Sequence, residues 1–337
     1  MATYTMTPYS ISFQPRYARG GERRPIADLD GKGLDLKSLI NDLLSTYDGD
    51  ELVVSPDDDS KSLRVRRLYP FEEHTFVEFG VGNGGVEGIL HQRSGGRVTY
   101  AADDHNETRV RGMFVFPKNG HEVYWLSEKA GQVSAYWHIT KLMKRLQRES
   151  VPDATVTMEP VADWAAIKAW SAAMSVKEIR FDSPRSGSST QAMSINGAHG
   201  EMRVIVKARG MRLNTLLKET GPDAEAIYGY LSEAPLVKNS GVSPAAIIGQ
   251  GWAAKVAFTN KAGRQRSFGL NLTDPAPTLI YQVGTAPAES DKTVSGVSRA
   301  YVPSDLEFDT TCAEFLDDIS KLLPAETTVV TAIMKNH

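Results

Sequence analysis

The stretch RVRGMFVFPKNGHEVYWLS, Arg109–Ser127, holds two runs of aromatic and β-branched residues on either side of a Pro, Asn and Gly turn. Runs of this kind, bounded by turn residues, are typical of neighbouring β-strands. Two similar runs precede them, HTFVEFG at 74–80 and RVTYAA at 97–102, again separated by glycine, asparagine and charged residues. Strands that follow one another this closely predict a mostly antiparallel sheet.

Helical periodicity lies on both sides of these strands. LDLKSLINDLLSTY at 34–47 spaces its apolar residues for one helix face: Leu36, Leu39, Ile40, Leu43 and Leu44. SAYWHITKLMKRLQRE at 134–149 does the same, and we expect Trp137, Leu142, Met143 and Leu146 to point inward. Runs of strands with a few helices, without regular strand-helix alternation, indicate an α+β fold of antiparallel sheets flanked by helices.

The length of 337 residues predicts two domains, an N-terminal α+β domain at 1–150 and a C-terminal α+β domain at 151–337. The second is the candidate for dimerisation, and its Ser- and Gly-rich loop at 182–200 is expected to be mobile. A later segment, TCAEFLDDISKLL at 311–323, predicts a closing helix.

Composition excludes several classes of protein. A single cysteine, Cys312, rules out an intramolecular disulfide framework and a thiolate-rich zinc site, and we expect it to be a small apolar residue of a helix. The seven histidines include no i, i+4 pair for a metal, so we expect neither metal nor cofactor. The sequence MATYTMTPYS has no signal-peptide pattern, and no apolar run is long enough for a membrane span, which predicts a cytoplasmic protein.

One glycine-rich motif suggests a nucleotide site. Gly80, Gly82 and Gly85 in FVEFGVGNGG fit the G-x-G-x-x-G spacing after a strand, with Asp103 about 20 residues further on, and they resemble the first motif of S-adenosylmethionine methyltransferases. The helix that should follow is only about two turns long, and more strands come after it. We therefore favour a Gly-rich hairpin turn, with a methyltransferase using the 80–85 glycine loop as the alternative.

Positive charge gathers in places although the formal net charge is −3. SLRVRRLY at 62–69 predicts a strand on which Arg64 and Arg66 share a face, while an acidic segment at 304–318 has no basic residue. Three acid-poor clusters supply the candidate DNA contacts: Lys141, Lys144, Arg145 and Arg148 on a helix, Arg203, Lys207, Arg209 and Arg212 on a strand-helix unit, and Lys261, Arg264 and Arg266 on a hairpin.

Such clusters bind phosphates through charge, largely without reading sequence. Solvated faces of a protein-binding scaffold that does not contact DNA are the alternative interpretation. No recognition helix, zinc finger or RNA-binding aromatic signature is visible in the sequence.

Several segments together resemble the Rex-type phage exclusion proteins, the RexA family of temperate phages. They are LDLKSLINDLLS, SLRVRRLYPF, MFVFPKNGHEVYWLSEKAGQVSAYWHITKLMKRLQ, TVTMEPVADWAAIKAW and RVIVKARG, in this order along much of the chain. The resemblance implies a two-domain α+β architecture related to ring-forming, recombination-associated DNA-binding proteins. It also implies a homodimer that binds double-stranded DNA without sequence preference and excludes superinfecting phage together with a membrane-protein partner.

The sequence thus predicts a non-enzymatic DNA-binding protein of a temperate phage or prophage, acting in superinfection exclusion or in control of the lysogenic state.

Overall fold

The computed structural model describes residues 4–16, 22–49, 53–55, 58–84, 88–91, 97–100, 106–161, 166–167, 170, 174–182, 203–207, 253–259, 265–271, 274–284, 302–320 and 323. The chain divides into two compact units: unit 1 is Met1–Glu159 with Ala286–His337, and unit 2 is Pro160–Thr285. Residues 151–159 and the segment from 286 onward therefore group with unit 1, whereas the sequence division placed them in a second domain beginning at residue 151.

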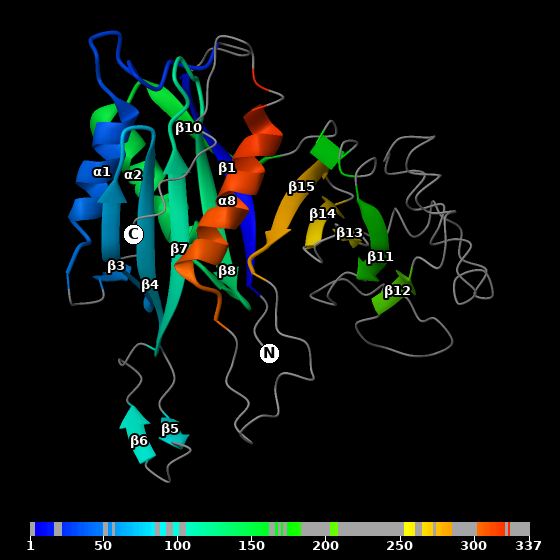
Figure 1. Ribbon diagram of the computed structural model, residues 1–337. Helices are drawn as coiled ribbons and strands as arrows, with labels where there is room; N and C mark the ends of the chain where they lie inside the picture. The colour runs from blue at the N-terminus through cyan, green and yellow to red at the C-terminus, as the bar shows by residue number, and fades with distance from the viewer. Residues whose placement is uncertain are drawn as a thin grey trace, which may run out of the picture. The chain divides into compact units, whose positions relative to one another are not determined.

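Unit 1 is built on an antiparallel sheet with strand order β1-β8-β7-β4-β3-β2 (Figure 1). Its strands are β1 (Tyr4–Pro15), β2 (Val53–Ser55), β3 (Asp58–Pro70), β4 (His74–Asn83), β7 (Asn106–Val115) and β8 (Val123–Ala130). β9 (Val133–Ser134) pairs with β8, and β10 (Ala154–Pro160) pairs with β1. β5 (Gly88–His91) and β6 (Arg97–Tyr100) form a separate two-stranded sheet. The antiparallel sheet predicted from the sequence is confirmed.

Side-chain alternation gives this sheet two different faces. On β4, Val77, Phe79 and Val81 belong to the core that helices α1 (Leu36–Ser45) and α2 (Tyr136–Ser150) cover. Trp125 of β8 lies in the same core and stacks on the ring of Phe114, with 4.3 Å between ring centroids. The alternate residues of the strands point to the opposite face, which α8 (Asp305–Ser320) crosses (Figure 1).

Helix α1 follows the predicted pattern. Its buried residues are Leu36, Ile40 and Leu44, and its N-terminus is capped by Asp35, whose carboxylate accepts a hydrogen bond from the Ser38 N–H. Helix α2 buries His138, Ile139, Leu142, Met143 and Leu146. The prediction for Trp137 was wrong: its ring is only half-buried, because His138 and Ile139 take the inward positions of the first turn.

Helix α8 begins at Asp305, six residues before the predicted start. Ser304 and Glu307 form a capping box, in which the Glu307 carboxylate accepts from the Ser304 N–H at 2.7 Å and the Ser304 hydroxyl accepts from the Glu307 N–H at 3.3 Å. The helix buries Phe308 against Phe76 of β4 and Phe315 against Tyr124 of β8. Cys312 is fully buried beside Met6 of β1, which confirms the expected apolar helical role.

Unit 2 contains an antiparallel sheet with strand order β12-β11-β13-β14-β15. The strands are β11 (Ser175–Asp182), β12 (Arg203–Lys207), β13 (Ala253–Thr259), β14 (Gln265–Asn271) and β15 (Asp274–Gln282). β13 and β14 form the predicted hairpin, and Trp170 packs edge-on against Phe258 and Tyr281. Residues 183–200 of the predicted mobile loop lie outside the described residues.

None of the helices in the described ranges combines the length and the apolar character that crossing a bilayer requires.

Candidate nucleic-acid interface and the arginine network beneath helix α8

A β-bulge in β3 gathers arginines on the α8 face of the sheet. Val65 pairs with Phe79 and Arg67 pairs with Glu78, so Arg66 is an extra residue without a counterpart on β4. Both Arg66 and Arg67 therefore reach the carboxylate of Glu78. Strict alternation places only Arg64 and Arg66 on this face; the bulge adds Arg67.

Glutamates of the neighbouring strands lie between these arginines. Glu107 of β7 accepts from Arg64 at 2.8 Å and from Arg66 at 2.5 Å. The buried carboxylate of Glu78 also pairs with Arg109 at 2.6 Å. The side chains thus alternate in charge across three strands of the sheet.

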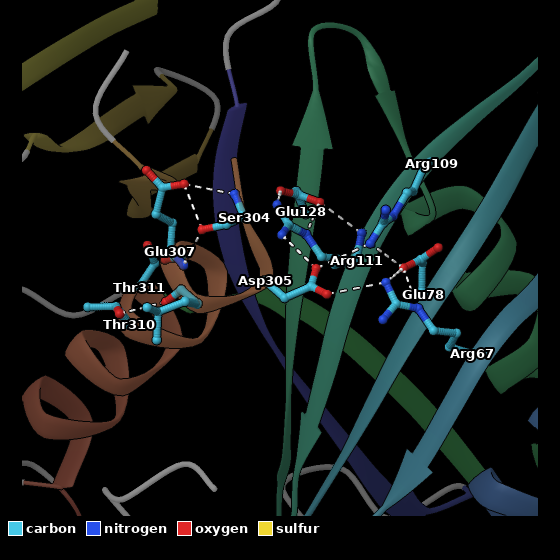
Figure 2. Close-up of polar contacts among 11 residues, drawn as sticks. Arg67, Glu78, Arg109, Arg111, Glu128, Ser304, Asp305, Glu307, Thr310 and Thr311 are labelled. Atoms are coloured by element: carbon cyan, nitrogen blue, oxygen red, sulfur yellow. Dashed lines mark hydrogen bonds and ion pairs between the residues drawn. The ribbon is translucent and has the colours of Figure 1, made fainter. Parts of the chain in front are cut away.

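Asp305, the first residue of α8, extends this network onto the helix (Figure 2). Its carboxylate lies 3.1 Å from Arg111, 3.2 Å from Arg109 and 3.2 Å from Arg67. Burial alone would raise the pKa of Asp305, but the hydrogen bond and charge of Arg111, followed by the charges of Arg67 and Arg109, hold the pKa below its ordinary value. Asp305 therefore anchors the start of α8 to the sheet as a carboxylate.

Arg111 and Glu128 form the most buried ion pair of this network, with side chains 3% and 2% exposed. The guanidinium donates to Glu128 at 2.5 and 2.9 Å, and the Arg111 backbone N–H donates to the same carboxylate at 2.9 Å. Burial would lower the pKa of Arg111, yet Glu128 and then Asp305 raise it, so the arginine stays charged. The Phe308 ring lies 5.0 Å from its guanidinium carbon and screens the pair from water.

A second acid of α8 has the opposite pKa shift. Asp309 is buried one turn after Asp305, and burial, with the charge of Asp305, raises its pKa to about 6, although Arg111 opposes this. Burial likewise raises the pKa of the Cys312 thiol well above its ordinary value, which suits a packing role and not a nucleophilic one.

The glycine motif has a structural explanation within this network. Gly80 and Gly82 lie inside β4, paired with β3 and β7, and residues 88–91 form strand β5. A Cβ at Gly80 would overlap the Glu107 carboxylate, so glycine makes room for this acid. The favoured hairpin turn is therefore wrong for Gly80 and Gly82, and the methyltransferase alternative has no glycine loop at these two positions. Gly85 and Asp103 lie outside the described residues.

Charge is nearly balanced in this network, which links five arginines to four carboxylates: Arg64, Arg66, Arg67, Arg109 and Arg111 with Glu78, Glu107, Glu128 and Asp305. Each guanidinium already has a carboxylate partner. The network is therefore better suited to attaching α8 to the sheet than to binding an anionic ligand. No group of three metal-ligating side chains occurs among the residues that the structure describes.

The first predicted basic cluster lies on the outer face of α2. Lys141, Lys144, Arg145 and Arg148 are all exposed, opposite the buried apolar residues of the helix. Arg145 pairs with Glu149 at 2.8 Å. Within the described part of the chain, Lys144 and Arg148 make no ion pair. Two of the four cations of this face, Lys144 and Arg148, are therefore not neutralised by an ion pair with a described acid.

The sequence did not point to Lys61, which lies beside this face. The Lys61 ammonium of β3 lies 4.4 Å from the centroid of a Trp137 ring, and the Lys141 ammonium lies 5.5 Å from it. The Lys141 contact follows from i, i+4 spacing on a helix, whereas the Lys61 contact depends on how α2 packs across the sheet.

The other predicted residues are only partly placed. Arg203 and Lys207 lie on β12 as predicted, where the structure describes the backbone. Arg266 is partly buried, and its guanidinium carbon lies 5.5 Å from the ring centroids of Trp170 and Tyr281. Four predicted contacts lie outside the described residues: Arg209, Arg212, Lys261 and Arg264.

Comparison with known proteins identifies no family. No protein-family model matches the chain, and no curated protein matches it.

Proposed function

We propose that the chain is a sequence-nonspecific DNA-binding protein whose contact surface is the outer face of α2. The observation that carries the proposal is the row of four exposed cations on one face of this helix: Lys141, Lys144, Arg145 and Arg148. DNA phosphates attract such a row through charge and the release of counterions, and neither effect depends on base sequence.

The spacing of the cations suits a phosphate backbone. They lie at i, i+3, i+4 and i+7, so they follow one side of the helix over two turns, about 10 Å of axis. Lys61 adds a fifth positive charge from β3 at the Trp137 end of the row. Within the row, Arg145 pairs with Glu149, and Lys144 and Arg148 form no ion pair with a described acid.

The experiment measures the salt dependence of binding to two unrelated 20-bp duplexes by fluorescence anisotropy. Reversing Lys144 and Arg148 to glutamate removes two phosphate contacts. We expect weaker binding to both duplexes and a log–log salt slope shallower by about 1.8, at about 0.9 per contact.

The matched control reverses Lys32 and Lys118, which are also exposed and lie outside α2; Lys118 pairs with Glu73. This variant changes the net charge by the same amount. If it weakens binding as strongly as the α2 variant, total charge and not the α2 face governs binding. If the wild-type protein binds neither duplex at 50 mM salt, the proposal is wrong.

The resemblance to Rex-type proteins supports a biological setting for this binding. We propose exclusion of superinfecting phage, or control of the lysogenic state, by a homodimer with a membrane-protein partner. The test expresses the chain in cells and compares phage plating efficiency between the wild type and the Lys144→Glu, Arg148→Glu variant. Equal plating on both strains and on the empty-vector strain would contradict this role, and sedimentation of the purified protein tests the dimer.

A further inference from the structure

Trp137 occupies an unusual place for the largest side chain of α2. The two residues that follow it, His138 and Ile139, are buried, and Tyr136 before it stacks on Tyr9 of β1 with 4.5 Å between ring centroids. The Trp137 indole is left half-buried at the edge of the core. Burial of a tryptophan stabilises a fold strongly, so an indole left partly in solvent is available for another contact.

The polar surroundings of this ring are cationic. Lys61 and Lys141 place their ammonium groups within 4.4 and 5.5 Å of the ring centroid, from two different elements. Both distances allow cation–π attraction. The basic residues of α2 continue from here through each of the next turns to Arg148, about 16 Å along the axis from Trp137.

We propose that Trp137 is a stacking platform for an unpaired base, and that the α2 face thereby binds single-stranded DNA through a contact that duplex DNA cannot make. Single-strand-binding surfaces combine a line of cations for the backbone with aromatic rings on which bases stack. Here the two lysines move from the indole to the phosphates of the bound strand, and a base takes their place on the ring. The inference rests on the proposed DNA-binding function and adds to it the kind of DNA that this end of the face recognises.

Charge complementarity selects this occupant. An acidic peptide could pair with the lysines, but it has no planar group to cover the indole once they move away. A duplex offers phosphates, but its bases are stacked on one another. An unpaired nucleotide supplies both the anion and the flat ring.

The experiment compares the full-length wild type with Trp137→Ala and Trp137→Phe, using fluorescein-labelled dT20 and a 20-bp duplex in anisotropy titrations. Trp137→Ala should weaken dT20 binding about 5- to 150-fold, the loss expected for one stacked base, and change duplex binding by less than about 2-fold. Trp137→Phe, which keeps an aromatic ring, should retain most of the dT20 affinity. The salt slope should be unchanged in both variants, because the phosphate contacts remain.

A spectroscopic measurement on the wild type needs no substitution and remains valid if Trp137→Ala fails to fold. A dT20 strand that carries 2-aminopurine should lose fluorescence on binding, because the base stacks on the indole. Rising fluorescence at every position of the label would overturn the proposal.

The outcomes separate this inference from the function on which it rests. Suppose that the wild type binds both DNAs. If Trp137→Ala then binds dT20 as tightly as the wild type, or loses affinity for dT20 and the duplex equally, Trp137 is not a stacking site, while the DNA-binding function is retained. If the wild type binds neither DNA, both proposals fail. Tight binding of rU20 without binding of dT20 would overturn the choice of DNA.

Discussion

Replacing Arg111 by methionine should destabilise unit 1 far more than any other single arginine substitution in the network. The variant leaves the Glu128 carboxylate, only 2% exposed, without the guanidinium that donates to it at 2.5 and 2.9 Å. Removing one partner of a buried ion pair costs about 3–5 kcal/mol, because the remaining charge is left in a medium that solvates it poorly. For a unit of this size the same loss lowers the unfolding temperature by about 6–20 °C.

The matched control is Arg109→Met. The Arg109 side chain is 45% exposed, and its partners keep other arginines: Glu78 retains Arg67, and Asp305 retains Arg111. This variant should cost about 1 kcal/mol or less, as exposed ion pairs do.

The assay combines urea unfolding with hydrogen exchange of peptides from β7 and β8, which localises the loss to unit 1. The double variant Arg111→Met, Glu128→Gln removes both charges while the Gln carbonyl still accepts from the residue 111 N–H. It should recover more than half of the loss. If Arg111→Met proves at least as stable as Arg109→Met, burial of the Arg111–Glu128 pair does not set the cost of breaking it, and the reasoning is refuted.

Three other perturbations test separate parts of the structure. Because burial raises the pKa of Asp309 to about 6, the folded chain holds this proton more tightly than the unfolded chain. The stabilisation by protonated Asp309 is therefore complete below about pH 4 and is lost as the pH rises through about 6. Urea unfolding should show the stability of the wild type relative to Asp309→Asn falling by about 2 kcal/mol between pH 4 and pH 6, and a pH-independent difference would refute the assignment. Gly112→Ala places a methyl group inside the buried Trp125 ring and should cost about 1–3 kcal/mol or more in thermal unfolding, whereas Gly80→Ala, which displaces only a carboxylate end, should cost less than half as much. Arg266→Met removes a cation that lies near two aromatic rings of unit 2, so it should lower the free energy of unfolding by about 1 kcal/mol. The affinity for DNA should stay within about 2-fold, and a large loss of affinity would show that Arg266 contacts DNA.

Local patterns predicted the elements of the fold. The alternating runs around Arg109–Ser127 predicted neighbouring strands, which β7 and β8 confirm. The apolar spacing in 34–47 predicted α1 and its buried residues. These features depend on residues within a few positions of one another, which a sequence displays directly.

The arginine network could not be predicted in this way. Period-two alternation places Arg66 and Arg67 on opposite faces of a strand, and no local signal marks the bulge that brings both to Glu78. Asp305 is 194 residues from Arg111 in the sequence, so only the packing of α8 joins them. The acidic segment at 304–318 was visible, but its first acid pairs with arginines that the three basic clusters do not include.

Trp137 shows the limit of helical periodicity. A stripe of apolar residues has edges, and Trp137 lies at such an edge while the more polar His138 is buried. Periodicity gives the inward-facing side of a helix only to within about one residue position. It therefore cannot tell which of the adjacent residues Trp137 and His138 is buried.

The attachment of α8 has a consequence for the order in which the chain is made. Unit 1 is discontinuous: the ribosome completes residues 1–159, then all of unit 2, and only afterwards the helix that supplies Phe308 and Asp305. Until then the nascent sheet exposes Phe76, and Arg111 and Glu128 lack the helix that covers them. Domains ordinarily fold as units while synthesis proceeds from the N-terminus. Here unit 1 begins before unit 2 and is completed after it, so translation arrest before residue 305 yields a chain whose unit 1 has an uncovered apolar face that chaperones and proteases can bind.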